Sequence, residues 1–138
     1  MEQLAVEIVG LCREYGECRV EVERMEEVRR VKNALESVCS MARQRLDISD
    51  PALLLALLDA CEVTRDEGML QEVLDVVGRN LDRLAVSAES VKLLAYCYYY
   101  VEEEECAERA RSMLEELRKL GMGEEELADA ETILEELT

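Results

Sequence analysis

Six cysteines are the residues of this chain best equipped for covalent or metal chemistry. None forms a Cys-x-x-Cys pair, and without histidine a zinc site would need four thiolates at spacings that the chain does not have. The six instead form three pairs on either side of expected turns: Cys12 with Cys18, Cys39 with Cys61, and Cys97 with Cys106. Because such residues lie at the same height in an antiparallel hairpin, each pair could form a disulfide if both Cβ atoms point inward.

The alternative to disulfides is a set of reduced thiols, buried as small apolar residues, which is the usual state in the cytosol of a mesophile. Intracellular disulfides do occur in hyperthermophiles. The excess of arginine over lysine, 13 against 3, and the abundant glutamate are compatible with a thermophilic source. Both states of the cysteines therefore stay open.

Paired carboxylates offer a second possible chemistry. Glu105 with Glu108, and Glu126 with Asp129, are spaced so that each pair lies on one helix face. Carboxylates from two such helices can together bind Mg²⁺. These residues are therefore the candidate metal ligands of the chain.

The spacing of these acidic pairs resembles the ExxE and ExxD pattern of the MazG-like all-α nucleotide pyrophosphatases. The resemblance is confined to a stretch near the C-terminus and implies a Mg²⁺-dependent nucleoside triphosphate pyrophosphohydrolase. The chain departs from the family after Asp129, where its helix is thinly apolar although the family has a buried one. With 33 acidic residues in the chain, pairs at this spacing also arise by chance.

Other catalytic patterns are absent from the sequence. It contains no Walker loop and no GxGxxG, GxSxG or HExxH motif. The absence of histidine also removes the commonest general base and the ExxH motif of carboxylate-bridged di-iron sites. We therefore expect no catalytic residues, no cofactor and no enzymatic activity, with MazG-like hydrolysis as the alternative.

Length and charge limit the class of protein. A chain of 138 residues can build one core, so we expect a single all-helical domain covering residues 1–138. The N-terminus is too polar and acidic for a signal peptide, and no apolar run approaches membrane-spanning length, so we expect a cytoplasmic protein. A net charge of -17 would repel nucleic acids and anionic membranes, which leaves another protein or a second copy of the chain as the expected partner.

Apolar residues recur every three to four positions, which predicts an all-α protein of about seven helices. The expected helices cover residues 2–15, 20–46, 51–64, 69–84, 88–101, the stretch that follows Glu102–Glu105 and ends at Gly121, and 124–137. The third is apolar nearly all round and should be the most buried, with Asp50 as its N-cap and Pro51 at its first position. Short turns between the helices suggest three stacked antiparallel hairpins followed by a C-terminal capping helix.

The clearest hairpin, residues 88–121, carries a second resemblance. Leu94, Ala95, Tyr98 and Ala107 resemble the leucine, small residue, tyrosine and alanine of the tetratricopeptide pattern. The chain departs from that pattern at three signature positions, occupied by Arg111, Leu114 and Lys119. The resemblance implies stacked helical-hairpin repeats, and an irregular helical bundle is the alternative.

Surface residues suggest a role in protein binding. The expected partner contacts are four cations early in the second helix and three tyrosines of the fifth: Arg24, Arg29, Arg30 and Lys32, and Tyr96, Tyr99 and Tyr100. Tyrosine is favoured in interfaces, and the cations could meet an acidic segment of a partner. The leading hypothesis is a non-enzymatic interaction module, such as a scaffold or adaptor. Besides the hydrolase, an acidic mimic of nucleic acid that inhibits a basic protein is the other alternative.

Overall fold

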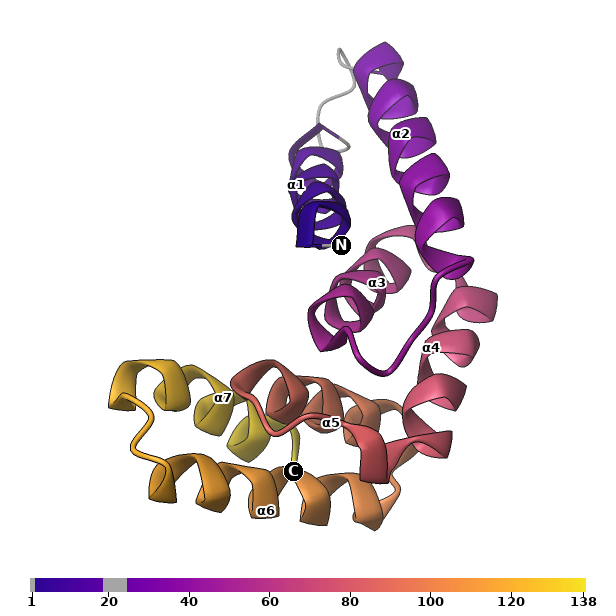
Figure 1. Cartoon of the computed structure of the whole chain (residues 1–138). Coiled ribbons are helices and arrows are strands. Elements are labelled where there is room, and N and C mark those ends of the chain that lie inside the picture. The colour runs from indigo at the N-terminus through magenta and orange to yellow at the C-terminus, as the bar shows by residue number, and fades with distance from the viewer. Residues whose placement is uncertain (1, 19–24) are drawn as a thin grey trace. The chain divides into compact units, whose positions relative to one another are not determined.

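The computed structural model describes residues 2–18 and 25–138, and these form seven α-helices, a short 3-10 helix and no strand (Figure 1). In chain order the elements are α1 (Glu2–Cys18), α2 (Met25–Arg43), α3 (Pro51–Thr64), α4 (Glu67–Arg79), η2 (Leu81–Arg83), α5 (Ala88–Val101), α6 (Glu104–Lys119) and α7 (Glu124–Leu137). The expected all-α fold with about seven helices is confirmed. Within the described ranges, no helix combines the length and the apolar character needed to cross a membrane.

We expected a single domain over residues 1–138, and this stays a prediction. The chain divides into two compact units, Met1–Val73 and Leu74–Thr138. The boundary between them falls inside α4, between Val73 and Leu74. No change in composition marks this position, because the residues on both sides belong to one amphipathic helix. For that reason, a search for polar or glycine-rich linkers in the sequence could not have found it.

In the N-terminal unit, α1 packs against both α2 and α3. Half of α3 is buried, as its apolar composition predicts: Leu53, Leu54, Ala56, Leu57, Leu58, Ala60 and Cys61. The helix begins as expected, with Pro51 in its first turn and the carboxylate of Asp50 accepting a hydrogen bond from Leu53 N at 3.2 Å. A side-chain hydrogen bond links α2 to α4, in which Arg43 Nε donates to Glu72 Oε2 at 2.9 Å.

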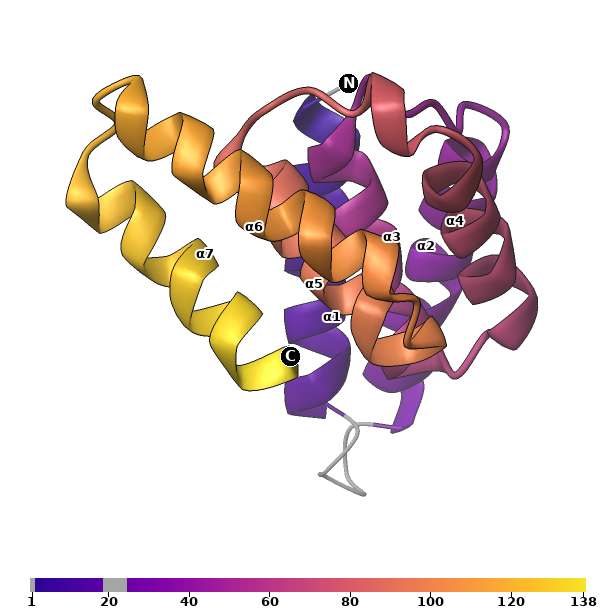
Figure 2. The same ribbon diagram turned by 90° about the horizontal axis from the view of Figure 1, so that it is seen from below.

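In the C-terminal unit, α5 packs against both α6 and α7, which contact each other less extensively. Figure 2 shows α6 and α7 running side by side in opposite directions. Ser87 caps α5, because its hydroxyl accepts a hydrogen bond from Ser90 N at 3.1 Å. Gly121 follows the last turn of α6 with a φ of +79°. Its N–H donates to Arg118 O and that of Met122 to Leu117 O, so α6 ends in a Schellman motif before the short turn into α7.

Several expected helix boundaries differ from the structure. The sixth helix begins at Glu104, inside the break expected at Glu102–Glu105. The first helix continues through Gly16 to Cys18, since one glycine costs a helix only about 1 kcal/mol. The second ends at Arg43 rather than residue 46, and residues 20–24 of that expectation lie outside the described part. The fourth begins two residues early, at Glu67, where the Asp66 carboxylate accepts from Met69 N at 3.0 Å. It ends at Arg79, and η2 takes up the remaining turn.

Candidate binding groove

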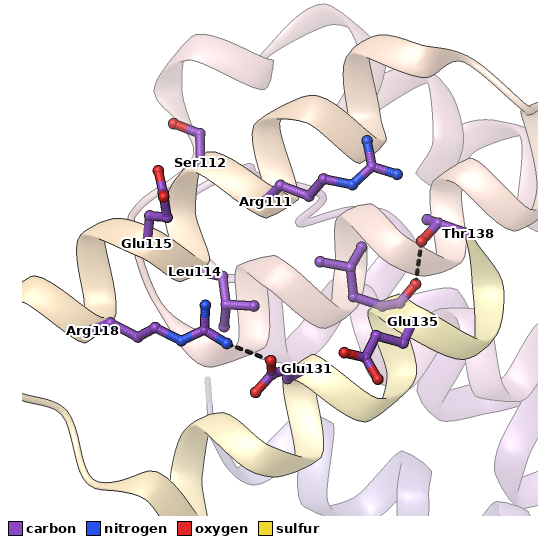
Figure 3. Close-up of a pocket in the computed structure, with 9 residues that line it drawn as sticks. Arg111, Ser112, Leu114, Glu115, Arg118, Glu131, Glu135 and Thr138 are labelled. Carbon is purple, nitrogen blue, oxygen red and sulfur yellow. Dashed lines mark hydrogen bonds and ion pairs between the residues drawn. The ribbon is translucent and has the colours of Figure 1, made fainter.

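An open groove runs between α6 and α7 in the C-terminal unit, and we call it the α6–α7 groove (Figure 3). One part has a volume of about 580 Å³ and is lined by Arg111, Ser112, Leu114, Glu115, Arg118, Glu131, Leu134, Glu135 and Thr138. The next part, of about 480 Å³, is lined by Arg118, Met122, Glu124, Leu127, Ala128 and Glu131. Because both parts share Arg118 and Glu131, these two side chains divide one continuous groove.

Helix periodicity explains the composition of the groove. Leu114 and Leu134 form its floor, with exposed fractions of 5% and 4%, because they lie at the edge of the apolar stripes that pack toward α5. Residues three or four positions away stand on the walls, such as Arg111 and Arg118 on α6 and Glu131 on α7. The antiparallel course of the two helices places Arg118 opposite Glu131 and Arg111 near Thr138 (Figure 3). The result is an apolar floor between charged walls.

The cations of the groove are neutralised, whereas several of its carboxylates are not. Arg118 forms an ion pair with Glu131, and Arg111 Nη1 lies 3.5 Å from Glu104 Oε1. Among the residues that the structure describes, Glu115, Glu124 and Glu135 have no cation within ion-pair distance. The unpaired charge of the groove is therefore negative.

The expected cationic contacts lie in the N-terminal unit. The side chains of Arg29, Arg30 and Lys32 are exposed on α2, and Arg30 Nη2 lies 4.0 Å from Glu27 Oε1. Arg29 and Lys32 are three residues apart and so share one helix face. Arg24 lies outside the described residues. The structure leaves the three described cations at the surface, and their role in binding stays a prediction.

The three expected tyrosine contacts lie near the C-terminal end of α5. Tyr99 is 58% exposed, and its ring meets that of Tyr100 edge to face, with centroids 5.3 Å apart and an interplanar angle of 76°. Tyr96 and Tyr100 are half-buried and lie on one side of the helix, four residues apart. Tyr99 is thus the tyrosine of the three that is most available to a partner.

The described cysteines are buried free thiols, namely Cys12, Cys39, Cys61, Cys97 and Cys106. The expected bridges Cys39–Cys61 and Cys97–Cys106 are therefore not formed in this structure, which instead contains the reduced, packed thiols that the sequence left as an alternative. Cys12 is also a free thiol, so the expected bridge Cys12–Cys18 is not formed in this structure either, although the side chain of Cys18 lies outside the described residues.

Burial also controls the reactivity of these thiols. Desolvation raises the pKa of Cys61 and of Cys97 to about 12, and the pKa of Cys12 and of Cys39 to about 11. The neighbouring thiol of Cys106 adds to the shift at Cys97. Since the thiolate is the nucleophile and the metal ligand, a raised pKa leaves little of the reactive form of these thiols near neutral pH.

The acidic pairs do not assemble a metal site. No three histidine, cysteine, aspartate or glutamate side chains of residues 2–18 and 25–138 come together in a way that could bind a metal ion. The reason is the register of the helices. Thr138 at the end of α7 lines the groove together with Arg111, so Glu105 and Glu108, one to two turns before Arg111, lie beyond the end of α7. Glu126 lies at the opposite end of that helix, near the turn. Asp129 binds a lysine instead, with its Oδ2 2.6 Å from Lys92 Nζ.

Sequence reasoning did not identify the α6–α7 groove. Its walls are ordinary arginine and glutamate residues at helical spacing, and this pattern also describes any solvated helix face. The signal that was present is the narrowness of the apolar stripe on α7, which is equally compatible with the capping helix that we expected there. Comparisons of the chain with protein families, with curated proteins and with solved structures find no match. The fold and the groove together define an all-α protein of two compact helical units with an open helix–helix groove in the second.

Proposed function

We propose that the protein is a non-enzymatic interaction module that binds a partner protein through the α6–α7 groove. The observation that carries this proposal is an open groove with Leu114 and Leu134 at its floor and unpaired carboxylates on its walls. Apolar floors between two helices are docking sites for a third helix in many recognition domains. The module would thus act by binding, with no bond made or broken.

The dimensions of the groove suit a short helical segment. At 1.5 Å per residue, the 14 residues of α7 give a length of about 21 Å, enough for a ligand helix of about four turns. A segment of this size buries less surface than the interfaces of permanent complexes do, so it corresponds to a transient interaction. We therefore expect an adaptor-like contact with an affinity of about 1–100 μM.

The MazG-like alternative loses its main support, because its four carboxylates are not gathered at one place. The acidic mimic of nucleic acid remains a second candidate. It is favoured by the run Glu102–Glu105 at the α5–α6 turn, where all four side chains are exposed. Replacing Glu102, Glu103 and Glu105 with glutamine separates the two ideas, with Glu104 kept because it pairs with Arg111 of the groove. A mimic would lose its basic partner in this variant, whereas a groove-binding module would keep its own.

Site-specific photocrosslinking tests the interaction module. A benzophenone side chain replaces Ser112, which lines the groove, or Glu116, which is exposed on the same helix outside it. After irradiation in an extract of the source cells, we expect an adduct from position 112 that is absent from position 116. No adduct at either position, or the same adducts at both, contradicts the proposal.

A further inference from the structure

We infer that the ligand of the α6–α7 groove is an amphipathic helix of a partner protein whose apolar stripe is flanked by lysine or arginine on both sides. This inference rests on the proposed function and names the partner chemistry for the same site. It follows from the packing of the three helices, from the charges on the groove walls, and from the ion pair that divides the groove.

Packing leaves one side of the C-terminal unit open. Because α6 and α7 each pack more extensively on α5 than on each other, their outer faces diverge and leave the groove between them. A helix lying along the groove would contact both α6 and α7 as one more member of a bundle. Its apolar side chains would meet Leu114 and Leu134, and its polar side would face the solvent.

Charge selects a basic ligand. The two walls present Glu115 from α6 and Glu135 from α7, both exposed and both without a cationic partner in the described part of the chain. A helix with cations on each side of its apolar stripe would place one row of cations along the α6 wall and the other row along the α7 wall. The long aliphatic stems of lysine and arginine would also cover apolar surface at the groove edge. An acidic helix would be repelled by the unpaired carboxylates of the groove and by a chain of net charge -17.

The ion pair between Arg118 and Glu131 provides a second, independent test of the proposed ligand charge. Both side chains are about half exposed, at 48% and 39%, so the pair is screened by solvent and easily exchanged. A lysine of the ligand could replace Arg118 as the partner of Glu131. Removing the Arg118 charge should then favour a basic ligand, because it unites the two parts of the groove and frees a carboxylate.

Fluorescence anisotropy with a synthetic probe tests these steps. The probe is a labelled 16-residue helical peptide with leucines at positions i, i+3, i+4 and i+7 and lysines flanking that stripe. A matched peptide carries glutamate in place of each lysine. We expect the lysine peptide to bind and the glutamate peptide to bind at least about 10-fold more weakly, with the affinity for the lysine peptide falling as salt increases.

Two pairs of variants locate the binding. The double variant Glu115→Arg with Glu135→Arg should weaken binding of the lysine peptide by about 10-fold or more. Its control, Glu116→Arg with Glu136→Arg, changes the net charge equally on the same two helices but outside the groove, and should alter binding by less than about 3-fold. Arg118→Gln should strengthen binding by about 3-fold, whereas Lys119→Gln, one residue outside the groove, should leave it nearly unchanged. A gain in affinity cannot come from misfolding.

The outcomes are distinct. Equal weakening by the two double variants would mean diffuse attraction to an acidic protein and would overturn the inference. The inference also fails if the glutamate peptide binds as well as the lysine peptide, or if neither binds. Light scattering that shows a dimer abolished by the Glu115 and Glu135 changes would assign the groove to a second copy instead. If a groove-specific adduct forms at position 112 but the lysine peptide fails, the interaction function stands and only the proposed partner chemistry is wrong.

Discussion

Lys92 Nζ on α5 lies 2.6 Å from Asp129 Oδ2 on α7. The lysine thus forms an ion pair with a carboxylate that the sequence pattern had indicated as a candidate metal ligand. On the other side of α7, Glu131 is paired with Arg118 of α6. The last helix is therefore connected by one ion pair to each of the two helices on which it packs. Its acidic residues serve packing and surface charge in this arrangement, with no gathering into a metal site among the described residues.

Replacing Asp129 with asparagine should lower the free energy of unfolding by up to about 1 kcal/mol, because the pair is partly exposed, at 27% for Lys92 and 65% for Asp129. Urea denaturation at low salt measures the loss, which should shrink in 1 M salt, where the screening length falls to about 3 Å. Glu136→Gln, which neutralises an exposed carboxylate on the same helix away from its N-terminus, is the matched control and should not destabilise the protein. A saturable Mg²⁺ titration that disappears in the Asp129 variant would contradict this assignment and restore the hydrolase alternative.

Replacing Gly78 with alanine should stabilise the protein by about 0.5–1 kcal/mol, since glycine is unfavourable inside a helix. A Cβ atom at this position of α4 would meet no heavy atom within 4 Å, so the added methyl group causes no clash. Gly121→Ala provides the opposite case, because φ there is +79° and alanine is strained in that conformation. Thermal or urea denaturation should show that Gly78→Ala is more stable than the parent protein and that Gly121→Ala is less stable. The reverse order of stability would be incompatible with these backbone conformations.

Replacing Glu102 with glycine should stabilise the protein by about 1 kcal/mol, because glycine adopts a left-handed conformation without the steric cost that a side chain imposes. Glu102 ends α5 in this conformation, with φ of 53° and ψ of 28°, and its N–H donates to Tyr98 O. Glu102→Ala removes the same carboxylate but keeps Cβ, so it should bring no comparable gain. If both variants are equally stable in urea, the effect comes from the charge and the conformational explanation fails.

Stability should fall as pH rises above about 9, in part because of Cys97. Burial raises the pKa of this thiol from 9.0 to about 12, so the unfolded chain loses the proton first and unfolding is favoured in that interval. One such thiol contributes a slope of up to about 1.4 kcal/mol per pH unit between the two pKa values, and nothing below the lower one. Urea midpoints at pH 7.5 and pH 10 should therefore differ less in Cys97→Ala than in the parent. Equal pH dependence of the two proteins would show that the thiol ionises freely in the folded state.

Local signals in the sequence were sufficient for several elements. The helices Pro51–Thr64 and Glu124–Leu137 have the bounds that periodicity and flanking residues predict, and Asp50 and Gly121 act at the helix ends as expected. Each of these features depends on residues within a few positions of one another. The boundary at Gly16 was wrong because a single unfavourable residue is a weak signal, which the neighbouring residues of α1 outweigh.

The sequence by itself determined that the chain is helical, where most of its helices lie and which residue types each helix buries, because these properties follow from side chains three or four positions apart. Tertiary structure alone decided the division inside α4, the pairing of Asp129 with Lys92, the free thiols of Cys39 and Cys61, and the α6–α7 groove. All of these depend on how far one helix is rotated and shifted against another. That register is set by the packing of whole helix faces against α5 and α3, and no short stretch of sequence records it.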